Sequence, residues 1–570
     1  MATRAGGSET SPARPIGAPA GATPPGAVRG AARAAEAHPA PDAWWLVAGA
    51  GALLLVLRVA AARFGTFSEG DEISIASGVA AVVRGEAGDT YRYGVQVGYY
   101  QLVAAITSLL GARLLTIPDV MTWLSVLGGT VIPVAGLLAF RHDLTARERW
   151  LAGALLAANP VVWQAARYGN TATVSVALTV IALAILSNRP QRLGEALAML
   201  SFAAAIFVRA DAVLASGAAF ALLWRRHRAL MRAALPLAAC GVVVAGTFGW
   251  LVLADPRMGD VVGAVASHDD NEIYTRFLEF LLVGMSPVPL LMAAAGARDL
   301  QRERPWLLAV LAAWIVPFSA FYFTNTTSPR YLMQLMPPLC LAAAVGILRS
   351  FAAAGWQRTV SIAVLLPLSF VHLLVGLTNF NPARRRSWLT EATLPSHDGP
   401  VYTGALLYKT FVQRPDAEKA WWRLRRFGPS NQAERTVAQL FEAIGAPGWQ
   451  GRPIVLVTAG GYGNELHFMA HVAGATIVAQ EPGMSFNRPT RFRHRGQELL
   501  AVGVPDLEAR AARLPVRAGD ELWALYPSRE RATADLGALL PPGLALASLP
   551  EWPSTERLWP YRVIDTPTAR

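Results

Sequence analysis

The sequence has few charged residues and almost no cysteine. Of its 570 residues, 16% are charged and 53% are hydrophobic, and the mean hydropathy is +0.34. Soluble globular proteins carry about 25% charged residues, so this composition excludes an ordinary soluble domain and predicts an integral membrane protein. Cys240 and Cys340 lie far apart in apolar runs, which is typical of buried thiols rather than of a disulfide or a metal pair.

The N-terminal segment lacks the features of a signal peptide. Residues 1–42 contain no apolar run followed by a small-residue cleavage pattern. They are rich in Ala, Gly, Pro and Ser with scattered Arg, and we expect a disordered cytoplasmic tail. The sequence also has no internal repeat of fixed period.

Apolar stretches of spanning length follow this tail. A helix needs about 20 residues to cross the hydrocarbon core, and fewer where polar ends reach the interface. Eleven spans are expected, at 43–61, 118–140, 148–166, 171–187, 194–208, 211–224, 233–253, 274–296, 306–323, 331–348 and 359–378.

The arginines decide whether one further stretch, 97–112, also crosses the membrane. If it does not, and the N-terminus is cytoplasmic, five loops face the cytoplasm and each carries at least two arginines. These loops are 141–147, 188–193, 225–232, 297–305 and 349–358. Since this arrangement obeys the positive-inside rule, we expect 97–112 to lie at the outer interface. The net charge of +12 then reflects the arginines of the cytoplasmic loops, which set the membrane orientation, and no nucleic-acid partner is expected.

The expected organisation is a polytopic α-helical membrane protein with an external C-terminal domain. The transmembrane domain is 43–378 and contains a long first external loop at 62–117, and the external domain is 379–570. That domain is expected to be α/β. Its strand-like runs are 453–460, 475–480, 521–526 and 561–565, and one helical run is 430–444.

Acidic residues open the first external loop, in "SEGDEISIAS" at 68–77. One interpretation of Asp71 and Glu72 is an acidic first helical turn, in which Ser68 and Asp71 form a weak capping pattern. The other is catalytic, because a carboxylate at this position can accept a proton from an acceptor. Taken alone, the motif favours the cap.

Further polar residues are predicted at the same outer face. They are Arg167 and Asn170 in "ARYGNTAT", Arg209 and Asp211 in "VRADAV", and Arg330 and Tyr331 in "TNTTSPRY". The arginines could contact lipid headgroups, and Asp211 could simply pair with Arg209. Ionisable groups at a membrane are costly, however, and mark functional sites by default. A carboxylate base together with cations suits a reaction in which a phosphate leaves.

The order of these motifs resembles the GT-C membrane glycosyltransferases of the protein O-mannosyltransferase and lipid A aminoarabinose transferase type (glycosyltransferase family 39 and its bacterial relatives). The similar segments are "GDEISIASGVAAVVRGE", "YGVQVGYYQLVAAITSLLG", the stretch from "RHDLTARERW" to "ARYGNTAT", and "SPRYLMQLMPPLCLAAA". The resemblance covers about 43–350 and implies an inverting transferase at the outer face of the plasma (inner) membrane. Its partners would be a polyprenyl-phosphate sugar donor, a lipid, glycan or protein acceptor, and membrane lipids.

The resemblance also implies roles for individual residues. Asp71 would be the general base, with Glu72 beside it. The candidates for donor phosphate binding are Arg330, Arg209 and Arg167, and those for substrate binding are Tyr331, Asn170, Asp211 and Tyr99.

Two departures from the family pattern bear on a metal. Many relatives carry a second acid in the turn where this chain reads "YGNTAT", with Asn170, Thr171 and Thr173 as the nearby side chains, and many have Lys near the position of Arg209. Without the second acid a two-carboxylate metal site is not expected, so no obligate cofactor is predicted, although a divalent metal stays open. A transporter or flippase of a lipid-linked substrate is the alternative function, but the interrupted helices of two related halves are not evident.

Overall fold

The computed structural model describes residues 44–62, 70–85, 90–188, 191–254, 287–325, 329–352, 454–458, 462–480, 489–549 without 510 and 527, and 558–566, with a few single positions between them. The predicted tail at 1–42, most of the predicted span at 359–378 and all of 379–439 lie outside these residues.

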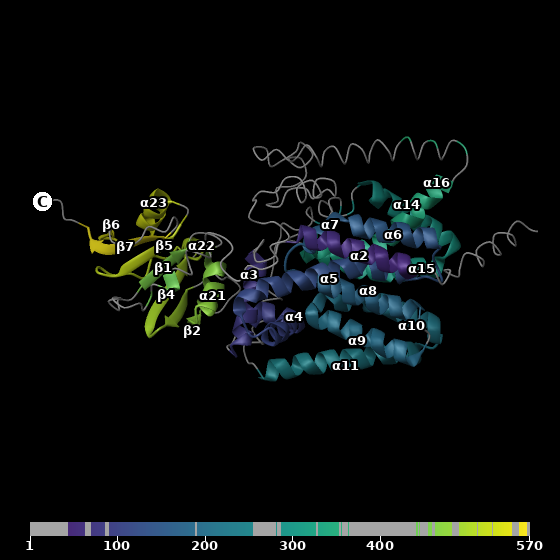
Figure 1. Cartoon of the computed structure of the whole chain (residues 1–570), viewed down its shortest axis with the longest axis horizontal. Coiled ribbons are helices and arrows are strands. Elements are labelled where there is room, and N and C mark those ends of the chain that lie inside the picture. Colours follow the sequence, from purple (N-terminus) through teal and green to yellow (C-terminus); the bar gives the residue numbers. More distant parts are fainter. Residues whose placement is uncertain are drawn as a thin grey trace, which may run out of the picture.

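The membrane part is a bundle of helices (Figure 1). Its first half contains α2 (Trp44–Ala61), α3 (Gly70–Val83), α4 (Thr90–Leu109), η2 (Leu114–Thr116), α5 (Ile117–Leu138), α6 (Ala146–Ala158), α7 (Pro160–Ala165) and α8 (Thr171–Asn188). Its second half contains α9 (Arg192–Val208), η3 (Ala210–Ala215), α10 (Ser216–His227), α11 (Leu230–Ala254), α14 (Pro287–Glu303), α15 (Pro305–Asn325), η4 (Pro329–Leu335) and α16 (Met336–Ala352).

The predicted spans correspond closely to helices. Six stretches of the described residues are long and apolar enough to cross a membrane, at Trp44–Ala61, Leu114–Leu138, Thr171–Asn188, Leu230–Leu251, Pro305–Phe323 and Tyr331–Ala352. The chain is therefore a multi-pass membrane protein, and the full number of eleven spans stays a prediction. The predicted span at 274–296 differs, because its helix α14 continues to Glu303 and most of 274–286 is outside the described residues.

An Asn-Pro pair breaks one predicted span in two. Asn159 has an extended backbone between α6 and α7, as expected for a residue that precedes proline. Its side-chain Oδ1 accepts hydrogen bonds from the amides of Val161 and Val162, at 3.0 and 3.1 Å, so it caps the start of α7. The break directs the short helix α7 toward the turn that carries Arg167 and Asn170.

Ion pairs join the basic loops at one end of the bundle. Arg225 pairs with Asp143 at 2.7 Å, Arg304 with Glu148 at 2.9 Å, and Arg226 with Glu195 at 3.0 Å. These pairs connect the loops before α6, before α9, after α10 and before α15. Four of the arginine-containing loops that the sequence assigns to one side of the membrane therefore lie close together in the structure.

The segment between α2 and α5 lies at the opposite end. Arg167 Nε donates to the carbonyl of Ala61 at the end of α2, at 3.1 Å, and the Asn170 amide donates to Ser125 Oγ early in α5, at 2.7 Å. One turn, 166–170, therefore contacts both the last residue of α2 and the third turn of α5. The helices between them, α3 and α4, lie at this same end (Figure 1).

The C-terminal region is the expected α/β fold, with more strands than predicted. Its elements are β1 (Ile454–Thr458), α21 (Tyr462–Val472), β2 (Thr476–Gln480), β3 (Thr490–His494), β4 (Gln497–Gly503), α22 (Val504–Ala509), β5 (Glu521–Leu525), α23 (Arg529–Leu539), β6 (Leu544–Ser548) and β7 (Leu558–Asp565). The four predicted strands correspond to β1, β2, β5 and β7, whereas β3, β4 and β6 were not predicted.

The sheet has the order β2-β3-β4-β1-β5-β7-β6. Its central strands β4, β1 and β5 are parallel, and the flanking pairs are antiparallel. The residues of β1 are buried throughout, because apolar side chains cover both faces of a central parallel strand.

The C-terminal domain packs directly on the helix that carries the predicted catalytic acids. Helix α21 contacts α3, and the two helices contribute to one apolar core with α4 and one face of the sheet. Arg84, just after α3, donates from Nη1 to the carbonyls of His471 and Ala475, at 3.1 and 2.7 Å. The carbonyl of His471 lies in the last turn of α21, where a cation is favourable, and that of Ala475 lies in the loop between α21 and β2. The domain therefore contacts α3 through apolar packing and through the two hydrogen bonds of Arg84.

Candidate functional site at the loop end of the bundle

Glu72 is a buried carboxylate at the start of α3. It is 1% exposed, and its Oε1 accepts a hydrogen bond from the amide of Gly169 at 2.7 Å. Gly169 has no side chain to interfere with this approach, and a Cβ there would lie 2.9 Å from Oε1. The contact ties the first external loop to the turn between α7 and α8, 97 residues later in the chain.

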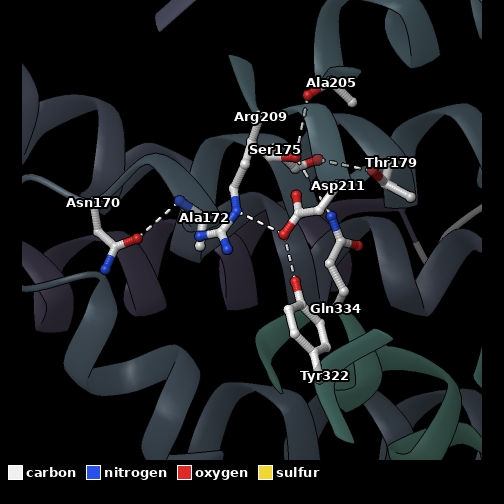
Figure 2. A network of polar contacts seen from close by, with 9 residues as sticks. All are labelled: Asn170, Ala172, Ser175, Thr179, Ala205, Arg209, Asp211, Tyr322 and Gln334. Carbon is white, nitrogen blue, oxygen red and sulfur yellow. Dashed lines mark hydrogen bonds and ion pairs between the residues drawn. The ribbon is translucent and has the colours of Figure 1, made fainter. Parts of the chain in front are cut away.

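Asn170, the next residue of that turn, holds the start of α8. Its Oδ1 accepts from the amide of Ala172 at 2.8 Å, the usual geometry of an N-cap, and Figure 2 shows this contact. Its backbone amide and carbonyl also bond to Ser125 Oγ, at 2.7 and 3.2 Å. Asn170 is 5% exposed, so its side-chain amide stabilises the turn and the start of α8.

Arg209 and Asp211 lie between α9 and α10 and form an ion pair. Arg209 Nε donates to Asp211 Oδ2 at 2.8 Å, and the guanidinium carbon lies 4.8 Å from the ring centroid of Tyr331. The hydroxyl of Tyr322, on α15, donates to the same Oδ2 of Asp211. Asp211 therefore pairs with Arg209, as one sequence-based interpretation expected, and this does not by itself exclude a role in substrate binding.

A second contact joins η4 to α8. Gln334 Nε2 lies 3.4 Å from Ser175 Oγ, and Ser175 Oγ donates to the carbonyl of Ala205 at 3.2 Å, as Figure 2 shows. Ser175 is five residues after Asn170, or about 7.5 Å along a helix. The Asn170 cap and the contact between Gln334 and Ser175 therefore both lie in the first two turns of α8.

The structure brings together most, but not all, of the predicted site residues. Glu72, Asn170 and Arg167 meet at the turn before α8, and Arg209, Asp211 and Tyr331 form the second cluster. Tyr99 is 0% exposed in the core that α3, α4 and the C-terminal domain share. The side chains of Asp71 and Arg330 lie outside the described residues, although their backbones belong to α3 and η4.

Five residues of these contacts were not predicted: Ser125, Gly169, Ser175, Tyr322 and Gln334. Ser125 and Gln334 are polar positions within apolar spans, and that is a usable signal because such residues are costly in a membrane. Gly169 and Tyr322 carry no comparable signal, since their roles depend on partners far away in the chain. Among the described residues, no group of three or more His, Cys, Asp or Glu is arranged to hold a metal ion.

Comparison with known proteins gives matches at the level of structure. No protein family matches the sequence, and no curated protein does. The structure is similar to ArnT from Cupriavidus metallidurans in the apo state, with 14% identity, a TM-score of 0.51, and coverage of 90% of this chain and 97% of that chain. ArnT bound to undecaprenyl phosphate is similar at 16% identity and a TM-score of 0.50, with 92% and 98% covered.

A third similar structure is the arabinofuranosyltransferase AftD from Mycobacteria. It has 14% identity and a TM-score of 0.48, with 93% of this chain and 40% of that chain covered. The two ArnT structures cover nearly the whole of both chains, including the C-terminal domain. The similarity to the two ArnT structures therefore shows that the chain has the fold of ArnT.

Proposed function

We propose that the protein is an inverting glycosyltransferase, which moves a sugar from a polyprenyl-phosphate donor to an acceptor hydroxyl. The reaction would take place at the outer face of the plasma (inner) membrane, with the N-terminus in the cytoplasm and the C-terminal domain outside. The observation that carries the proposal is the convergence of the Asn170 cap and the contact between Gln334 and Ser175 on the first turns of α8, at the end of the bundle where α3 presents its acidic start. The similarity to ArnT supports the same reaction class.

Asp71 is the proposed general base. As the acceptor oxygen bonds to the anomeric carbon, its proton passes to the Asp71 carboxylate, and the bond between that carbon and the phosphate oxygen breaks. The electron pair of this bond leaves with polyprenyl phosphate, and the configuration at the anomeric carbon inverts. A positioned carboxylate can act in this way because it accepts the proton as the proton becomes acidic in the transition state.

The arginines are proposed to stabilise the phosphate as its charge increases. Forked guanidinium donors suit phosphate oxygens. The ion pair of Arg209 uses Nε, which leaves its two Nη nitrogens for the donor, and Arg330 and Arg167 would complete the set. Tyr331 and Asn170 would line the same space, whereas the buried Asp211 and Tyr99 would support it from behind.

No obligate metal is proposed. Glu72 Oε1 and Asn170 Oδ1 each accept a backbone amide, and these two oxygens are therefore already used in holding the turn. The acceptor would be a lipid, a glycan or a protein hydroxyl.

The test is sugar transfer from synthetic polyprenyl-phosphate sugars by the purified chain, its Asp71→Asn variant and its Glu69→Gln variant. Cell-envelope extract supplies the acceptor. We expect transfer by the wild type and by Glu69→Gln, which loses a neighbouring carboxylate, and none by Asp71→Asn. Transfer by Asp71→Asn would refute the assignment of the base. Donor flux across proteoliposomes without any transfer would refute the enzyme and indicate a transporter.

A further inference from the structure

The guanidinium of Arg209 is fixed on two sides. Asp211 Oδ2 holds Nε at 2.8 Å, and the ring of Tyr331 lies against the guanidinium with 4.8 Å between its centroid and Arg209 Cζ. The Nη nitrogens make no hydrogen bond to the described residues, and the side chain is 12% exposed. The Nε of Arg209 is therefore held by Asp211, whereas its two Nη nitrogens can donate hydrogen bonds to an anion.

Asp211 is itself held by a residue from a distant helix. Tyr322 lies 111 residues further along the chain and is 1% exposed, and its hydroxyl donates to the Oδ2 atom that also accepts from Arg209. Two donors thus converge on one oxygen of a side chain that is 9% exposed. With Tyr322 in place, Asp211 has little freedom to change rotamer, and Oδ2 stays directed at Arg209 (Figure 2).

We propose that Asp211 and Tyr322 are positioning residues, which orient Arg209 so that its two Nη nitrogens bind the phosphate of the lipid-linked donor. The inference rests on the proposed function, because the donor supplies the phosphate. Arg209 is held in one direction before the ligand arrives, so less side-chain freedom is lost on binding.

The orientation of Arg209 should also affect kcat, because the phosphate gains negative charge as it leaves the sugar. Its interaction with Arg209 becomes stronger in the transition state than with the bound donor. Loss of the orientation should therefore lower kcat in addition to weakening phosphate binding.

The experiment measures the Kd of undecaprenyl phosphate for the purified full chain in detergent, and kcat for transfer. The variants are Arg209→Ala, Tyr322→Phe, and both together. We expect Tyr322→Phe to weaken binding about tenfold, as for loss of one well-oriented charge-assisted hydrogen bond. In the Arg209→Ala background, Tyr322→Phe should change Kd no further, because its effect passes through Arg209.

Tyr526→Phe is the matched control. It also removes a buried phenol hydroxyl, in the C-terminal domain, which has no hydrogen-bond partner among the described residues, and it should bind as the wild type does. Tyr322→Phe with wild-type Kd and kcat, or effects of Tyr322→Phe and Arg209→Ala that simply add, would overturn the inference while leaving the transferase intact. A wild type that binds no undecaprenyl phosphate would instead overturn the proposed donor, and the inference with it.

Discussion

Gly169→Ala tests the contact between the two external loops. A Cβ at this position would lie 2.6 Å from Met121 Cβ and 2.9 Å from Glu72 Oε1. Met121 Cβ is attached to the backbone of α5 and cannot rotate away, so the turn must move and the 2.7 Å hydrogen bond to Glu72 must lengthen. Overpacking costs about 1–3 kcal/mol, and losing a hydrogen bond to a charged group costs about 1.5–3 kcal/mol. The sum is a loss of about 2.5–6 kcal/mol.

Thermal unfolding in detergent and sugar transfer are the two assays for this variant. We expect the apparent Tm of Gly169→Ala to fall by about 2–5 °C and transfer to fall with it, because Asp71 precedes Glu72 on the same helix. Gly49→Ala is the control: the same change is made in α2, where a Cβ meets no atom within 4 Å, and its Tm should not fall. If Gly169→Ala kept the wild-type Tm and transfer rate, the contact would have no structural importance and the reasoning would be refuted.

Two further predictions concern buried ionisable side chains. Arg58 is 1% exposed; its Nη1 donates to the carbonyl of Val162 at 3.2 Å, but its Nε and Nη2 have no hydrogen-bond partner among the described residues. Because burying incompletely paired charge is costly, Arg58→Met should raise the apparent Tm, and a lower Tm would contradict this. Burial lowers the pKa of His467 to about 3, and burial together with Arg84 lowers that of His471 to about 4. The unfolded chain then binds more protons, so the stability of the C-terminal domain should be complete above about pH 6.5 and decline from there toward pH 4, by up to about 1.4 kcal/mol per pH unit and histidine. Unfolding of the full chain followed between pH 7.5 and 4.5 measures this, and a flat profile in the wild type would be inconsistent with neutral buried histidines.

The sequence by itself determined the membrane class and most helix positions. Membrane crossing requires only apolar length, which is a local property, so α2, α5, α8 and α15 begin and end within two residues of the predicted spans. The span predicted at 148–166 is divided at Asn159-Pro160, because proline restricts the residue before it. Strands β1 and β5 were found as short apolar runs. Strand β3 was missed because Phe492 is the one apolar residue in "TRFRH"; its other buried positions are the polar residues Thr490 and His494.

Only the tertiary structure decided which polar residues meet. Glu72 and Gly169 are 97 residues apart, and Tyr322 and Asp211 are 111 apart. No local pattern encodes such pairs, because they form only when the apolar helices have packed. The sequence could therefore propose Glu72, Arg209 and Asp211 as members of one site. It could not reveal that Glu72 holds a backbone amide, or that a tyrosine on α15 completes the ion pair, because a buried polar group takes the partner that packing places beside it.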